Sequence, residues 1–268
     1  MLAMGGGRMF GLLKPKLLVD ADEFDWLLAC FAWLSEEFGV VERIARTALI
    51  LQQDFATSRA TGHERALEIF VAVKAMAGLA DWQCDLIPAQ ATRESRVTTG
   101  HGLRHTRQPA MGSFGYDQGR YFIRYNPALL EAPQRLVATF AHLLAHYVLH
   151  TARTSPPGGT MLKQQVCDVA AIRLGLGLFL VNTAKSFEQF QDFGEQGWQA
   201  QQSGALSENA MLTALALFVR LARVDAKSVE RELKDYLRGS LRKTLVVLDA
   251  RYPDLPAAVE AVDLGDWT

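Results

Sequence analysis

The feature that most constrains this chain is an apolar helical segment, Leu136 to His150, which reads LVATFAHLLAHYVLH. Its histidines His142 and His146 are four residues apart, so on an α-helix both imidazoles project from one face, about one turn apart. That spacing suits two ligands of a shared metal ion. His150 lies about 12 Å along the axis from His142 at 1.5 Å per residue, so a third ligand must come from another segment.

Composition bounds the class of protein. The 268 residues are 49% hydrophobic and 21% charged, which is typical of a soluble globular chain with one large core or two modest ones. A net charge of -1 offers no basic field for nucleic acid or an anionic membrane surface. The most apolar run, Leu174 to Val181, is far shorter than the roughly 20 residues of a membrane helix. Three scattered cysteines, Cys30, Cys84 and Cys167, indicate a reducing compartment, so we expect a cytoplasmic protein.

Periodic apolar residues predict a helix-dominated α+β fold, with a small β element before the histidine helix. Further helices are expected at Asp20–Phe38, His63–Ala77, Met161–Lys185, Ser207–Arg223 and Ser228–Ala250. Strands are expected at Leu86–Gln90 and Tyr121–Tyr125, the second preceded by a glycine-punctuated hairpin. Residues 1–19 are predicted to be a leader without structure, 20–80 an N-terminal helical part and 81–268 the core, all within one compact domain.

Three segments in order resemble zincins, the zinc metallopeptidases whose active helix reads HExxH and whose next helix supplies a Glu ligand, followed four residues later by Asp. The segments are NPALL, LVATFAHLLAHYVLH and QQVCDVAAIRLGLGLFLVNTA. More narrowly, they are similar to uncharacterised bacterial zincin-like proteins that read approximately ATxAHELAHYLL and ExxTDLxxVxxGxGIFxAN. The resemblance covers roughly Gly78 to Arg251 and implies a zincin-like fold.

The resemblance also implies roles for single residues. His142 and His146 match the two imidazole ligands, and Asp168 matches the aspartate that orients a ligand histidine. Leu143 stands where the catalytic Glu belongs, and Gln164 where the Glu ligand belongs. A neutral amide is a poor zinc ligand, and losing a general base costs about 10²- to 10⁴-fold in rate. The expected cofactor is therefore none, or weakly bound zinc.

The favoured hypothesis is a catalytically degenerate zincin-like protein, a pseudo-metallopeptidase that binds a protein or peptide partner or acts as a regulatory module. Its peptide-binding rim is expected on the second strand, at Tyr121, Ile123 and Tyr125. These aromatic and apolar residues would otherwise be ordinary core packing. Strand addition would let such a rim bind peptide backbone beside an inactive site.

Two alternatives stay open. In an active zinc-dependent hydrolase with a rebuilt site, His142, His146 and Asp168 would hold the metal, and Glu131 or His150 would supply the base. In a purely structural helical protein the histidines would be fortuitous, and Asp168 would lie far from both.

Three further features of the sequence are weaker candidates for a functional role. His101 and His105 repeat the four-residue spacing within glycine-rich HGLRH, which favours a solvated loop over a metal site. Cys167 is a soft ligand by chemistry, but a small buried cysteine by its place on an apolar helix. Gly175 and Gly177 predict close packing of their helix against a neighbour.

Overall fold

The computed structural model describes residues 16–39, 55, 59–89, 112–117, 119–192 and 206–267, without the side chains of 185–192. His101, His105 and residues 1–15 of the expected leader lie outside this part of the chain.

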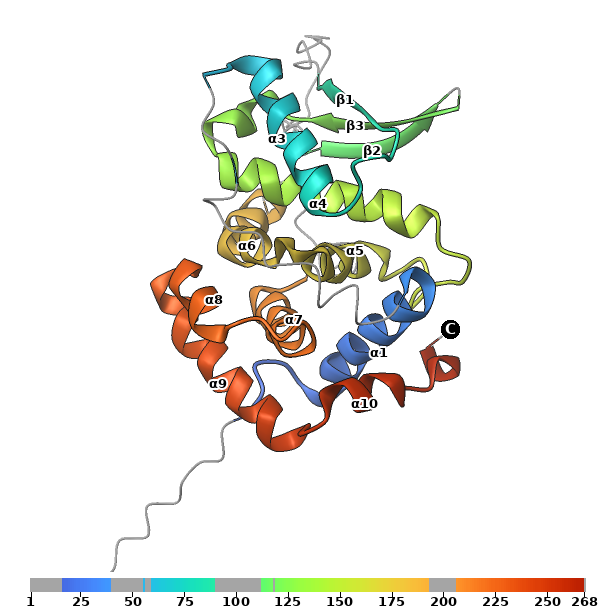
Figure 1. Ribbon diagram of the computed structural model, residues 1–268, viewed down its shortest axis with the longest axis vertical. Coiled ribbons are helices and arrows are strands. Elements are labelled where there is room, and N and C mark those ends of the chain that lie inside the picture. Colours follow the sequence, from blue (N-terminus) through green and yellow to red (C-terminus); the bar gives the residue numbers. More distant parts are fainter. Residues whose placement is uncertain are drawn as a thin grey trace, which may run out of the picture.

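The fold is mostly helical with one small sheet, as predicted. The helices are α1 (Ala21–Phe38), α3 (Gly62–Met76), α4 (Pro133–His150), α5 (Lys163–Ala171), α6 (Gly177–Asp192), α7 (Glu208–Leu221), α8 (Ala226–Glu232), α9 (Asp235–Arg251) and α10 (Leu255–Glu260). The strands are β1 (Asp85–Pro88), β2 (Gly112–Asp117) and β3 (Arg120–Tyr125). The sheet and α3 lie on one side of α4, and α5, α6 and α7 on the other, with α1, α9 and α10 beyond them (Figure 1).

The sheet has the order β1-β3-β2. β1 runs parallel to β3, with Leu86 opposite Ile123, whereas β2 and β3 form an antiparallel hairpin with Gly112 opposite Tyr125. The two expected strands are therefore confirmed within one or two residues. β3 is paired on both sides from Phe122 to Tyr125, which contradicts a peptide-binding rim at Ile123 and Tyr125. Both side chains are buried in the core, and the remaining edge near α4 belongs to β2.

Helix α4 lies at the centre of the molecule, where twelve of its eighteen residues are buried. Pro133 occupies its first turn, where the missing N–H would have had no partner within the helix. Phe140 is fully buried and meets the rings of Phe70 on α3 and Tyr125 on β3, with centroids 5.3 and 5.9 Å apart. This packing fixes α4 under the sheet and leaves its histidine-bearing face toward α5.

Capping residues confirm the beginnings of two predicted helices. The Asp20 carboxylate accepts a hydrogen bond of 2.8 Å from the Glu23 N–H at the start of α1. The Ser207 hydroxyl accepts one of 3.1 Å from the Ala210 N–H at the start of α7. Each cap satisfies a helix N–H group that has no partner within its own helix.

The two long helices expected near the C-terminal half are each broken. Between Met161 and Lys185 the chain forms α5, a π-helical turn at Ile172–Leu176 and then α6, because Gly175 adopts a φ of 90°. That left-handed conformation is open to glycine and strained for other residues. Between Ser228 and Ala250 the helix stops at Leu233, whose extended backbone separates α8 from α9.

The stretch Lys163–Ala184 is long and apolar enough to cross a membrane, with a mean hydropathy of 1.6, but 89% of it is buried within the fold. It therefore packs as a core segment of the fold. Gly177 explains part of its packing, since a methyl group there would lie 3.0 Å from Leu215 Cδ1 on α7. The close contact predicted for this glycine is confirmed, with α7 as one neighbour.

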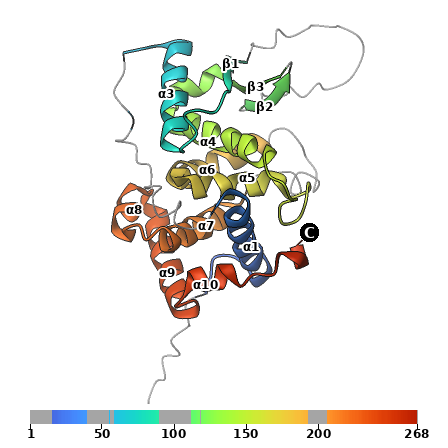
Figure 2. The same cartoon turned by 45° about the vertical axis from the view of Figure 1, so that its right-hand side comes forward.

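The N-terminal helices do not form a unit of their own. Helix α1 packs on α5, α7 and α10, whereas α3 packs on α4 and β1 at the other end of the molecule (Figure 2). Helices α1 and α3 are therefore both parts of one hydrophobic core.

Candidate functional site

The candidate site lies between α4 and α5, where both predicted histidines face a glutamine. His142 Nε2 is 3.1 Å and His146 Nε2 is 3.0 Å from the same atom, Oε1 of Gln164. The two imidazole rings have centroids 5.0 Å apart and are nearly perpendicular. The spacing in the sequence therefore brings the rings together, and α5 supplies the third side chain.

Asp168 approaches His142 from the other side of the ring. Its Oδ1 atom accepts a hydrogen bond of 2.7 Å from His142 Nδ1, and its Oδ2 atom accepts one of 2.8 Å from the Leu206 N–H. The carboxylate is 3% exposed and the imidazole 21%, so the pair is shielded but reachable from solvent on the histidine side. Asp168 thus stands as an orienting carboxylate, and the expectation that it lies far from both histidines, which the structural alternative required, is wrong.

The surroundings separate the proton affinities of the two histidines. Burial by itself lowers the pKa of His142, but the Asp168 carboxylate and the hydrogen bonds to Asp168 and Gln164 outweigh it, so the net pKa is raised. Burial, followed by the charge of His142, lowers the pKa of His146 to about 4. Of the two rings, His142 therefore binds a proton more readily, and His146 is neutral near neutral pH.

These protonation states suit an amide bridge. An amide oxygen only accepts, so each ring donates an Nε2–H to Gln164: His142 as an imidazolium bound to Asp168, and His146 as a neutral tautomer. If the amide of Gln164 is rotated by half a turn, its NH2 group donates one hydrogen bond to each of two neutral rings. Gln164 therefore ties the histidines together with or without the proton on His142.

Leu143, in the position of the expected base, faces the sheet. Its side chain is 5% exposed and lies under the backbone of Gly112 at the start of β2. A methyl group on Gly112 would come within 2.6 Å of Leu143 Cδ1, so the absence of a side chain there is what lets helix and strand approach. An isobutyl group cannot take up or release a proton, so this position offers no general base.

The donor set around the histidines does not fit zinc. Zinc sites use imidazole, thiolate or carboxylate donors, and here the third group is a neutral amide already hydrogen-bonded to both rings. Within the described ranges, no group of three or more His, Cys, Asp or Glu side chains is placed to hold a metal ion. Both oxygens of Asp168 are engaged elsewhere, which contradicts Asp168 as a ligand beside His142 and His146.

The remaining candidates lie away from the paired imidazoles. His150 is exposed and contacts the rings of Tyr121 and Phe114, 5.6 and 6.3 Å between centroids. Glu131 is exposed at the end of the 3-10 helix Pro127–Glu131. Cys167 is fully buried, and its pKa is raised by burial, so it behaves as a packed apolar side chain.

An aromatic surface on the β2–β3 hairpin extends from this site, and the structure adds its contacts with α4. Phe114 on β2 stacks near His146, with centroids 6.4 Å apart, and near Tyr147, 5.9 Å apart. Tyr121 adds a ring contact with Tyr147 at 4.5 Å. The alternation in β2, where Phe114 and Tyr116 share a face, was the available signal, but only the sheet register places Phe114 over α4.

Comparison with known proteins leaves this geometry as the basis for any assignment. No family model, no curated protein and no solved structure matches the chain.

Proposed function

We propose that this protein is a catalytically degenerate zincin-like protein that binds a protein or peptide partner without hydrolysing it. The observation that carries the proposal is the single amide oxygen of Gln164 within 3.1 Å of both His142 Nε2 and His146 Nε2. An uncharged hydrogen-bonding group links the two rings that the zincin resemblance assigns to a metal. Asp168, behind His142, keeps the orienting arrangement that the resemblance implies.

The apolar side chain at position 143 supports the absence of hydrolytic activity. Peptide hydrolysis at a metal site needs a base close to the attacking water, and the side chain after His142 is a buried leucine packed on Gly112. A rebuilt hydrolase with Asp168 as a ligand has no support in the geometry, because Asp168 is hydrogen-bonded to the opposite nitrogen of His142.

The edge of β2 supports peptide binding. β2 pairs with β3 along one side, and no other strand in the described ranges pairs with its second side. β1 is the opposite edge, but it has four residues and ends in Pro88, features that blunt an edge against strand addition. β2 has six residues and packs against α4, so a peptide added there would lie beside the histidine helix.

A separate pocket opens near the start of β3, and no residue of β2 lines it. It has a volume of about 670 Å³ and lies between the residues leading into β1, the β2–β3 hairpin and the end of α4. Trp82, Tyr121 and Tyr147 give it aromatic walls. A cytoplasmic location belongs to the same proposal and is supported by three cysteines that are all free.

The loss of hydrolysis is tested with the full chain, zinc and a broad peptide library, with products followed by mass spectrometry. We expect no cleavage above that of a His142→Ala variant. Zinc-dependent cleavage that His142→Ala abolishes would overturn the proposal.

Partner binding is tested by hydrogen exchange on the full chain in the presence of library peptides that bind. We expect slower exchange of backbone amides in β2, residues 112–117, while those of β1, residues 85–88, remain unchanged. Protection that spares β2 would contradict strand addition, and a library without any binder would contradict the peptide-binding role.

A further inference from the structure

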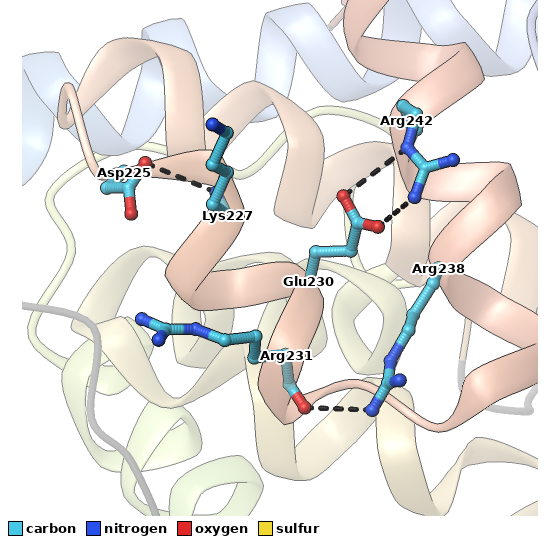
Figure 3. A pocket seen from close by; sticks show the side chains of 6 residues that line it. All are labelled: Asp225, Lys227, Glu230, Arg231, Arg238 and Arg242. Atoms are coloured by element: carbon cyan, nitrogen blue, oxygen red, sulfur yellow. Dashed lines mark hydrogen bonds and ion pairs between the residues drawn. The ribbon is translucent and has the colours of Figure 1, made fainter.

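A second pocket lies at the other end of the molecule, where α8 meets α9. It has a volume of about 570 Å³, and all six side chains that line it are charged (Figure 3). Four are cationic and two are carboxylates: Lys227, Arg231, Arg238 and Arg242, with Asp225 and Glu230. An excess of two positive charges in one pocket contrasts with the net charge of -1 for the whole chain, so it does not reflect a generally basic protein.

Both carboxylates already have partners of their own. Asp225 caps α8 by accepting hydrogen bonds from the N–H groups of Lys227 and Ser228, at 3.2 and 3.1 Å. Glu230 accepts two hydrogen bonds from the guanidinium of Arg242 (Figure 3). The negative charge in the pocket is therefore used for the helix cap and for one arginine.

Arg238 stabilises the corner between α8 and α9, which forms one wall of the pocket. Its guanidinium donates to the carbonyl groups of Leu233 and Arg231 at 2.9 and 3.0 Å and lies 2.8 Å from Asp235. Asn182 on α6 holds the same break, donating to the Glu232 carbonyl and accepting from the Lys234 N–H. These bonds make the wall of the pocket a fixed part of the fold, although its rim is exposed.

Lys227 and Arg231 form no close ion pair in the described part of the chain, although the Asp225 carboxylate is near enough to Arg231 for the two charges to interact. Both are exposed, and in the described part of the chain neither the Lys227 ammonium nor the Arg231 guanidinium has a hydrogen bond or an ion pair (Figure 3). They are four residues apart on α8, as Arg238 and Arg242 are on α9. Like charges at this spacing disfavour a helix, so placing Lys227 and Arg231 one turn apart does not stabilise α8.

We propose that this pocket binds a phosphate-bearing small molecule, held by Lys227 and Arg231. Guanidinium groups match the oxygen geometry of phosphate, and an ammonium adds a mobile charge from the next turn of the helix. The volume lies within the range of small-ligand sites. This site is separate from the histidine site and does not depend on the proposal made for it.

The test is calorimetric titration of the full chain with inorganic pyrophosphate at constant ionic strength. We expect saturable binding by the natural chain and a Kd at least about tenfold higher for Lys227→Ala/Arg231→Ala, since two charge-assisted contacts are lost. The matched control is Lys16→Ala/Lys243→Ala, which removes the same charge from exposed positions outside the pocket. It should bind as the natural chain does.

Three results would overturn the proposal. The first is no saturable binding up to about 10 mM pyrophosphate, well above the Kd of a specific site. The second is equal weakening by both double variants, which indicates a general charge effect. The third is equal affinity for citrate, which indicates an anion-accumulating surface without phosphate selectivity. Circular dichroism of both double variants shows whether the fold is retained.

Discussion

The Nδ1 atom of His142 lies 2.7 Å from Oδ1 of Asp168, and this contact joins three segments. Asp168 is on α5 and His142 on α4, while the second carboxylate oxygen holds the Leu206 N–H just before α7. A buried carboxylate with both oxygens engaged is costly to disturb, because its partners lose a charged acceptor.

We therefore expect Asp168→Asn to lower the free energy of unfolding by roughly 2–3 kcal/mol, measured in urea near pH 6. The amide keeps the shape but not the charge that stabilises a protonated His142. The double variant His142→Gln/Asp168→Asn should lose less than the sum of the two single losses, because the two residues interact directly. Additive losses would contradict a direct ion pair.

Gln164→Glu should create a zinc site. The substitution gives two imidazoles and a carboxylate facing one another, with Asp168 behind His142, which is a donor set that zinc accepts. We expect about one equivalent of zinc by elemental analysis after dialysis, against less than about a tenth for the natural chain. Gln165→Glu adds the same charge one residue away and should bind none. One equivalent in the natural chain would show that the amide does not exclude metal.

The lowered pKa of His146 predicts a loss of stability in acid. Between its ordinary value near 6.5 and its folded value of about 4, the unfolded chain binds a proton that the folded chain does not, so stability falls as pH falls through this window. The loss from this group is at most on the order of 3 kcal/mol. His146→Gln should flatten the dependence of the unfolding free energy on pH between 4 and 6.5. His150→Gln, on the same helix but exposed, should leave it unchanged.

For His142 the dependence of stability on pH has the opposite sign. Its raised folded pKa gives stability that is fully present below pH 6.5 and is lost as pH rises through the folded value. His142→Gln should thus remove a decline on the alkaline side, and an unchanged alkaline limb would contradict the ion pair with Asp168. Together the two histidines predict that the free energy of unfolding is highest where the acid window of His146 ends and the alkaline window of His142 begins.

Gly112→Ala should destabilise the protein by about 1–3 kcal/mol, because the added methyl group would lie 2.6 Å from Leu143 Cδ1 and 2.7 Å from the Arg124 carbonyl oxygen. Thermal or urea unfolding measures the loss. The matched control is Gly239→Ala on α9, where nothing beyond the adjoining residues and the backbone of the helix itself lies within 4 Å of the new group. It should stabilise by roughly 0.5–1 kcal/mol, since alanine favours a helix over glycine. If both variants were neutral, α4 and β2 would not pack as closely as described.

Local pattern was enough for most elements of the fold. Apolar periodicity located α4, and the predicted ranges that begin at Asp20 and Ser207 gave the starts of α1 and α7 correctly. The break between α5 and α6 has a local cause in Gly175, whereas the break between α8 and α9 depends on a distant residue. Asn182, about fifty positions before the gap between α8 and α9, satisfies the backbone groups on both sides of that break. No window of the sequence around Leu233 contains that partner.

The candidate site likewise combines features that the sequence determines with features that depend on how the elements pack. The sequence by itself determined that His142 and His146 share one helix face and that leucine and glutamine stand at positions 143 and 164, because these facts follow from identity and the 3.6-residue period. Only the tertiary structure decided that Gln164 bridges both rings, that Leu143 packs on Gly112, and that β2 is the edge strand beside α4 among the described strands. Hydrogen-bond partners and burial depend on how separate elements pack, and that packing also separates the pKa values of two chemically identical histidines.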